Sequence, residues 1–280
     1  IVYTDIISTV SNSYAEEIKT PQYGEGLDGL LRKRGKDLFG IINGISYEEF
    51  NPFTDIRIYR NYDIDSIQLK NENKYSLQEE LGLPIGDMPV IGLISRLSGQ
   101  KGLDLVIEKT DAIMKNNVQF VLLGTGDPYY ESIFTEIKNR YPSKVAVFIG
   151  FNVVLAQKIY AGCDMFLMPS RFEPCGLGQI ISLRYGTIPI VRAVGGLADT
   201  IVDYNEDEQN ANGFCFKEFS SKAMYDAIER ALLLYNNQPE KWLELKKKAL
   251  VQDFSWVKSA EKYIELYNLA IRERKEVEAV

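Results

Sequence analysis

One carboxylate and several glycines stand together directly after an apolar segment of the chain. Residues 169–179 read PSRFEPCGLGQ; they follow a strand-like segment at 164–168 and lead into a helix-like segment at 179–185. Ligands bind beyond the carboxyl ends of the strands in an open parallel sheet, and the first turn of a helix favours anions. We therefore expect Glu173 to lie in a ligand site; the alternative is that its carboxylate only caps the helix that follows.

Two cations, Arg96 and Lys101, stand in a second segment of this kind, SRLSGQKG at residues 95–102, between an expected strand and an expected helix. A planar guanidinium and a compact ammonium both suit a phosphate group, and glycines let the backbone approach a ligand closely. The segment is not a P-loop, because the order Gly-x-x-x-x-Gly-Lys-Ser/Thr is missing. Taken alone, solvated surface cations are the simpler interpretation, but together with the segment around Glu173 a phosphate site is favoured.

Two further glycine-containing segments follow expected strands. Gly195 and Gly196 open the run GGLADT, whose backbone N–H groups could form a nest for an anion or only a tight turn. The run GTGD at residues 124–127 resembles a dinucleotide fingerprint only superficially, since Tyr129 stands where the third glycine would be. Binding of NAD is therefore disfavoured.

The bulk properties restrict the kinds of partner and chemistry. The 280 residues carry a net charge of −7, which argues against a nucleic-acid partner without excluding a local basic pocket. The chain has no histidine, so histidine-dependent serine, cysteine and zinc mechanisms are excluded for this chain alone. The three cysteines are not spaced as metal ligands and no acidic metal cluster is evident, so we expect reduced thiols, a cytoplasmic location and no metal. No apolar run reaches about 18 residues, so no membrane span is expected.

Apolar strands alternate with amphipathic helices from residue 89 onward, which is typical of a doubly wound parallel sheet. We expect strands at 90–94, 119–123, 145–149, 164–168, 188–191 and 213–216. We expect helices at 103–115, 130–141, 153–161, 179–185, 222–235, 239–251 and 256–275, the last with Ser255 as its N-cap.

The region before residue 89 has too little apolar periodicity to predict a separate folded domain. Residues 41–45 read as a strand, and the capping-box pattern from Ser76 to Glu79 predicts a short helix that starts there and runs into Leu81. The chain begins Ile-Val-Tyr, with neither a methionine nor a signal sequence, so we expect it to be cut from a longer protein.

The segment around Glu173 closely resembles the Glu-Pro-Cys-Gly-Leu segment of bacterial glycogen synthases and plant starch synthases, which are retaining glucosyltransferases of the GT-B fold. Residues 95–104 (SRLSGQKGLD), 195–200 (GGLADT), 9–18 (TVSNSYAEEI), 40–45 (GIINGI) and 253–256 (DFSW) also match segments of that family. The resemblance covers nearly the whole chain. It implies a Rossmann-like, doubly wound α/β fold that is the C-terminal half of a GT-B enzyme. Residues 1–45 would be the end of a truncated N-terminal domain and the hinge, 46–255 the nucleotide-sugar-binding domain, and 256–280 a C-terminal helix and charged tail.

The resemblance also implies roles for individual residues. In that family, the residues that match Arg96 and Lys101 bind the diphosphate of the donor, and the residue that matches Glu173 contacts the transferred glucose. An aromatic side chain at the position of Phe151 stacks on adenine; an ordinary core phenylalanine is the alternative. Backbone amides that contact sugar or phosphate are expected at Cys175, Gly176, Leu177 and Gly178. The run that begins with Gly195 and Gly196 lies near the donor site.

Two positions depart from the residues that many relatives carry. Gly178 stands where a hydroxyl or apolar side chain is common, and Ile181 stands where many retaining GT-B enzymes have a second glutamate. An isoleucine cannot hydrogen-bond a ribose, so the resemblance leaves the ribose contact unassigned.

The resemblance implies an enzyme that transfers glucose from ADP-glucose to the non-reducing end of an α-1,4-glucan with retention and without a cofactor. Its partners would be ADP-glucose or ADP and a glucan acceptor, which would bind mainly to an N-terminal domain that this chain lacks. We find no candidate protein nucleophile for the glycosyl centre, so a front-face departure of the diphosphate is favoured over double displacement.

Two alternatives stay open. The isolated chain could be a nucleotide-sugar-binding module without transferase activity, because half of the cleft is absent. It could also come from another GT-B enzyme, of the sucrose type or a phosphorylase, the latter needing a lysine-bound pyridoxal cofactor.

Overall fold

The computed structural model describes the backbone of residues 1–278 and the side chains as far as residue 275. Its centre is a six-stranded sheet in the order β5-β4-β3-β6-β7-β8, with parallel pairing throughout. The strands are β3 (Val90–Ile94), β4 (Gln119–Gly124), β5 (Val145–Ile149), β6 (Met165–Met168), β7 (Ile188–Arg192) and β8 (Phe214–Phe216). From β3 the chain winds outward to β5 and then returns to the other side of β3. The predicted doubly wound parallel sheet is therefore confirmed.

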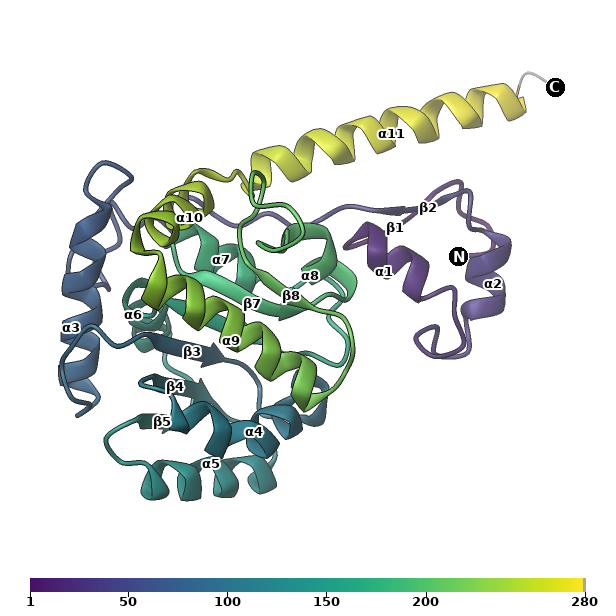
Figure 1. Ribbon diagram of the computed structural model, residues 1–280. Helices are drawn as coiled ribbons and strands as arrows, with labels where there is room; N and C mark the ends of the chain where they lie inside the picture. Colours follow the sequence, from purple (N-terminus) through teal and green to yellow (C-terminus); the bar gives the residue numbers. More distant parts are fainter. Residues whose placement is uncertain (279–280) are drawn as a thin grey trace.

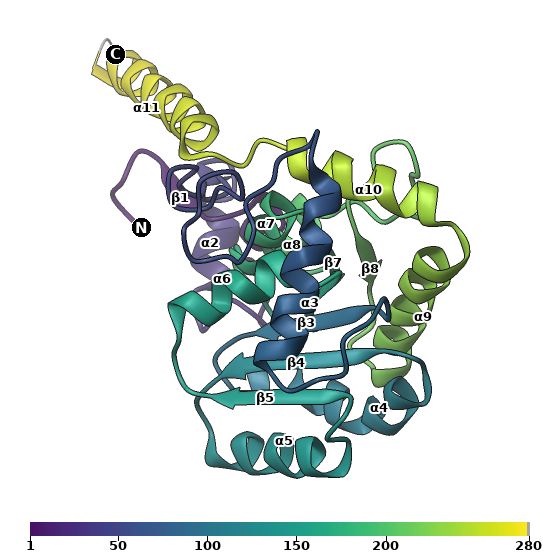
Figure 2. The same cartoon turned by 90° about the vertical axis from the view of Figure 1, so that its left-hand side faces the viewer.

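Helices cover both faces of this sheet (Figures 1 and 2). One face carries α4 (Leu103–Lys115), α5 (Pro128–Arg140) and α9 (Ser221–Asn237), and the other carries α3 (Lys70–Glu80), α6 (Val153–Gly162) and α7 (Gly178–Arg184). β3 and β4 are therefore buried on both faces, and their residues are almost all apolar, as expected of central parallel strands. α10 (Pro239–Val251) packs against α7 and α9, and α11 (Trp256–Glu278) extends away from the sheet (Figure 1).

The first 40 residues form a small unit beside the sheet domain (Figure 1). It contains a two-stranded parallel sheet and two short helices: β1 (Ile7–Thr9), β2 (Leu38–Gly40), α1 (Asn12–Glu17) and α2 (Asp28–Lys33). The buried residues of its apolar cluster are Ala15, Leu31 and Leu38, and the partly buried Ile7 and Ile18 pack against them. The unit docks through α1 onto α8 (Gly195–Thr200) of the sheet domain.

The elements predicted from residue 89 onward are confirmed, with ends that differ by no more than three residues. The last helix begins directly after Ser255, whose N–H donates to Asp253 Oδ1 at 2.9 Å. These elements were predictable because each strand is a short apolar run and each helix has a local amphipathic period.

The predicted strand at 41–45 is wrong. The strand ends at Gly40, and residues 41–45 run on as a connector in which Ile45 donates its N–H to Phe254 O at 2.9 Å. Ile41 and Ile45 are 4% and 3% exposed. The Ile41 N–H donates to Thr9 O at 2.8 Å and Ile45 forms an isolated bridge with Ser255. Strand-like contacts thus occur at the two ends of the segment without a continuous strand, and the apolar character of both residues goes with their burial.

The predicted helix start at Ser76 is also wrong, because α3 begins six residues earlier, at Lys70. The buried face of this helix is mostly polar: Lys70, Asn73, Lys74, Leu77 and Gln78. A buried face of this composition produces no apolar period, so the sequence pattern indicated only the second half of the helix.

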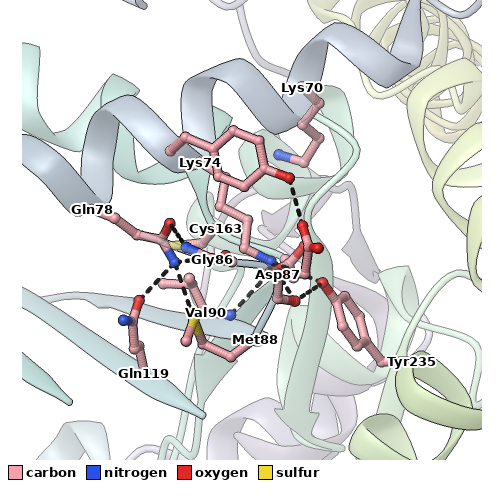
Figure 3. A network of polar contacts seen from close by, with 12 residues as sticks. Lys70, Lys74, Gln78, Gly86, Asp87, Met88, Val90, Gln119, Cys163 and Tyr235 are labelled. Atoms are coloured by element: carbon pink, nitrogen blue, oxygen red, sulfur yellow. Dashed lines mark hydrogen bonds and ion pairs between the residues drawn. The ribbon is translucent and has the colours of Figure 1, made fainter. Parts of the chain in front are cut away.

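Polar contacts dock α3 on the sheet (Figure 3). The Lys74 ammonium lies 2.9 Å from Asp164 Oδ2 and donates to the Tyr235 hydroxyl at 2.8 Å. Asp164 Oδ2 also accepts the N–H of Val90, at the start of β3, at 2.9 Å. Lys70 is buried, and desolvation lowers its pKa to about 7. This network lies at the starts of β3 and β6, the end of the sheet opposite to the loops described below.

Within the part of the chain that the structure describes, none of the helices combines the length and apolar character that a membrane span requires.

Replacing Asp164 with alanine should leave the Lys74 ammonium buried without its carboxylate and the Val90 N–H without its acceptor. We expect the free energy of unfolding to fall by about 3–5 kcal/mol, measured by urea denaturation. Asp111→Ala is the control, because its pair with Arg140 is exposed and should leave the urea midpoint almost unchanged. Equally small effects of both substitutions would contradict a stabilising role for the buried pair.

Candidate functional site

The carboxyl ends of β3 and β6 lie side by side at the centre of the sheet. The loop after β3 carries Arg96 and Lys101, and the loop after β6 carries Glu173. Because the chain winds away from these two strands in opposite directions, the two loops border a crevice, which is the usual ligand site of such sheets. The structure thus brings together the two segments that the sequence singled out.

An ion pair joins the two loops. The Lys101 ammonium lies 2.6 Å from Glu173 Oε2, and the same oxygen accepts the Ser170 hydroxyl at 2.9 Å. Glu173 is 7% exposed, so the pair is partly shielded from water and its charges are less screened than those of a surface pair. The carboxylate does not cap a helix; among the described residues its hydrogen-bond partners are Lys101 and Ser170.

Arg96 is held at the same crevice by a residue that sequence reasoning missed. Gln100 Oε1 accepts from Arg96 Nη2 at 2.9 Å, and Gln100 Nε2 donates to Phe172 O at 3.3 Å. The backbone N–H of Arg171 donates to Gln100 O at 2.8 Å. Gln100 therefore fixes the guanidinium and ties the two loops together.

A cavity of about 380 Å³ opens between the loops. Its wall includes Arg96, Lys101, Glu173, Gly176, Leu177 and Gly178. Cys175 is absent from this wall; it is 7% exposed, and burial raises the pKa of its thiol, so the side chain is not an activated nucleophile. The cavity combines two cations with one carboxylate, and the net positive charge suits an anionic ligand.

Packing against Phe166 explains why position 178 is a glycine. A Cβ there would lie 2.9 Å from the Phe166 ring, a contact too short for carbon atoms. The Phe166 ring therefore fills the space that a side chain at position 178 would need.

A second, apolar cavity of about 710 Å³ continues from the first, since Ile94, Ser95, Arg96 and Tyr160 line both. Its wall includes Phe151, which is 87% exposed, so Phe151 is not the core phenylalanine that was its alternative. Ile181 also lines it, without a polar atom to offer a ribose. The cavity suits the flat, largely apolar part of a ligand.

Several residues of this second cavity were missed from the sequence. Gly124, Thr125 and Gly126, which resembled a poor dinucleotide fingerprint, lie in its wall. Glu49 and Gln157 supply polar side chains. Nothing in the local pattern marks Glu49 or Gln157; the glycine run after β4 was the available signal.

The predicted anion nest at Gly195 and Gly196 is not open to a ligand. The Gly195 N–H donates to Glu17 Oε1 at 2.8 Å, and the Gly196 N–H donates to Glu173 O at 3.1 Å. Neither glycine lines the two cavities described above. Glu17, from the N-terminal unit, is a residue that sequence reasoning missed, and desolvation raises the pKa of its carboxyl group.

The two glycines instead support the loop that carries Glu173. A Cβ at Gly195 would lie 2.1 Å from Glu173 O, and a Cβ at Gly196 would lie 2.0 Å from Cys175 O. Backbone therefore packs directly on backbone, and only glycine permits this approach.

Comparison with known proteins gives consistent matches. A family model described as glycosyl transferases group 1 matches residues 79–249, and a model described as starch synthase catalytic domain matches residues 1–33. The chain is 56% identical to a glycogen synthase of Desulforudis audaxviator over 97% of this chain and 54% of that protein. It is 55% identical to a glycogen synthase of Moorella thermoacetica over 98% of this chain and 56% of that protein. The chain thus spans about half the length of these curated relatives.

Solved structures agree with the sequence matches. The catalytic domain of starch synthase IV from Arabidopsis thaliana, bound to ADP and acarbose, superposes with a TM-score of 0.91 and 37% identity, over 96% of this chain and 56% of that chain. A sucrose-phosphate synthase from Thermosynechococcus elongatus superposes with a TM-score of 0.65 and 20% identity over 97% of this chain and 60% of that one; this likeness shows the shared fold alone.

Gly196→Ala should displace the loop at 173–175, because the new methyl group would collide with Cys175 O. We expect the free energy of unfolding to fall by about 1–3 kcal/mol, measured by urea denaturation. Gly29→Ala is the matched control: its Cβ would meet nothing nearer than Arg32 Nη2 at 3.8 Å, so stability should be unchanged or slightly higher. Equal stability of the two variants would show that the close backbone contact is dispensable.

Proposed function

Since the chain belongs to the group 1 glycosyl transferases, and within them to the glycogen and starch synthases, we propose that it binds the nucleotide-sugar donor. In the full enzyme, glucose would pass from ADP-glucose to the non-reducing end of an α-1,4-glucan with retention. The donor is a substrate, and no cofactor is proposed. Free thiols at Cys163, Cys175 and Cys215 support a cytoplasmic location as part of the same proposal.

The observation that carries the proposal is the meeting of Lys101, Arg96 and Glu173 at the crevice between β3 and β6. When the bond between glucose and phosphate breaks, negative charge grows on the departing diphosphate. Fixed cations stabilise that charge more in the transition state than in the ground state. Arg96 and Lys101 are proposed to do this in place of a metal ion.

Glu173 is proposed to contact the transferred glucose. Its Oε2 is taken by Lys101 and Ser170, which fixes the carboxylate at the cavity wall and leaves Oε1 to accept a sugar hydroxyl. Held by two donors, it is better placed to orient glucose than to attack its anomeric carbon. This supports a front-face departure in which the diphosphate helps to deprotonate the acceptor.

The donor is proposed to be an ADP-sugar. The starch synthase that superposes with a TM-score of 0.91 was solved with ADP and acarbose, and this supports ADP over UDP. Acarbose in that structure also supports a glucan as acceptor. Glucan binding is proposed to fall mainly to the other half of the full enzyme, because the chain spans about half the length of its relatives.

Lys101→Met should weaken ADP binding about 10- to 100-fold, because one charge-assisted hydrogen bond to a phosphate oxygen would be lost. Isothermal titration calorimetry on the 280-residue chain measures this directly. Lys115→Met is the matched control, because Lys115 lies in the last turn of α4, away from the cavity wall. Equal affinities in all three proteins would overturn the role of Lys101.

The chain alone is expected to bind ADP but to transfer little or no glucose from ADP-glucose to a glucan. The reason is that the donor cavity is formed within this chain, whereas the acceptor is proposed to bind elsewhere. Incorporation of radiolabelled glucose into glycogen measures transfer. Turnover comparable to that of a full-length relative would show that the chain holds an acceptor site of its own and would exclude the alternative of a pure binding module.

A further inference from the structure

Gln157 lies on the face of α6 that lines the apolar cavity. Four residues of this helix, spaced i, i+3, i+4 and i+7, contribute to the wall: Val153, Ala156, Gln157 and Tyr160. Gln157 is 2% exposed, and its Oε1 has no hydrogen-bond partner among the described side chains and backbone. An amide oxygen without a hydrogen-bond partner among the described residues is thus buried beside this mostly apolar cavity.

An unpaired buried oxygen is unusual, since most buried polar side-chain atoms have a partner. Gln78 and Gln119, also buried, follow this rule and bond to one another at 2.9 Å. Gln179 Oε1 is unpaired as well among the described residues, but Gln179 does not line this cavity. The carbonyl oxygen of Gln157 has lost its hydration without gaining a donor. Its place beside a 710 Å³ cavity points to a ligand that supplies that donor.

The position of Gln157 indicates which part of the donor it meets. The cavity with Arg96, Lys101 and Glu173 suits the diphosphate and the sugar, and the apolar cavity beyond Arg96 suits a base. Ser95 lines both cavities, and its buried hydroxyl also has no hydrogen-bond partner among the described residues. A ribose, which joins base to diphosphate, would lie at that junction and satisfy it.

We propose that Gln157 selects the base of the donor by accepting a hydrogen bond from the exocyclic amino group of a 6-aminopurine. This rests on the proposed function, in which the two cavities hold a nucleotide sugar. A glutamine amide pairs well with adenine, whose amino group donates while a ring nitrogen accepts. Hypoxanthine has an oxygen at the same place and uracil has no exocyclic amino group, so neither can donate to Gln157 Oε1 from that position; to bond their oxygen, the amide would have to turn and present Nε2.

Calorimetric titration with ADP and inosine diphosphate tests the inference. We expect the wild-type chain to bind ADP about tenfold or more tightly than inosine diphosphate, and Gln157→Met to bind the two within about twofold. Methionine is similar in volume and removes the unpaired oxygen. The thermal midpoint of the ligand-free variant should therefore be unchanged or higher, which a purely structural glutamine would not show.

Gln119→Met is the matched control. Gln119 is the first residue of β4, is 1% exposed and lies outside the cavity wall. Its side chain accepts a hydrogen bond from Gln78 and donates one to Pro84 O. This substitution should lower the thermal midpoint and leave the preference for ADP unchanged.

Two results would overturn the role of Gln157 and leave the donor site standing: equal binding of both nucleotides by the wild-type chain, or full retention of the ADP preference in Gln157→Met. Binding of neither nucleotide by the wild-type chain would instead overturn the donor site proposed for this chain, and the inference with it.

Discussion

The parallel pairing of β3 with β6 is the constraint on which the rest of the site depends. These strands are neighbours in the sheet, but α4, β4, α5, β5 and α6 lie between them in the chain. Connections leave them in opposite directions, so the loops that follow them border an open crevice. Lys101 and Glu173 meet across that crevice at 2.6 Å. Two cations facing one carboxylate leave the crevice positive, which is the electrostatic property a diphosphate needs.

Close backbone packing fixes the positions of these loops relative to one another. A Cβ at Gly102 would lie 1.9 Å from Pro169 O, and a Cβ at Gly196 would lie 2.0 Å from Cys175 O. Three strand-to-helix loops therefore pack main chain against main chain around the crevice. The function of these glycines is to permit that approach, and the charged side chains gain fixed positions from it.

The N-terminal unit takes part in the same support, although it lies far away in the sequence. Ser11 donates its hydroxyl to Pro174 O at 2.6 Å, and Asp199 of α8 accepts the N–H of Ser13 at 3.1 Å. In the reverse direction, Glu17 of α1 accepts the N–H of Gly195, the first residue of α8. A carboxylate of each of these two helices thus accepts a backbone N–H from the first turn of the other helix. The loop that carries Glu173 is therefore supported by the N-terminal unit as well as by the glycines of α8.

The sequence by itself determined the sheet and the two charged loops. Strands such as Val90–Ile94 are short apolar runs followed by glycine and polar residues, and such signals are local. Tertiary structure decided what depends on partners distant in the chain. The polar face of α3 is buried because Asp164 and Tyr235 reach it, the Gly195 N–H is taken because Glu17 lies against it, and the oxygen of Gln157 is bare because no neighbour reaches it within the described residues. Hydrogen-bond partners of buried groups are set by the packing of segments, and a one-dimensional pattern of apolar and polar residues does not contain that information.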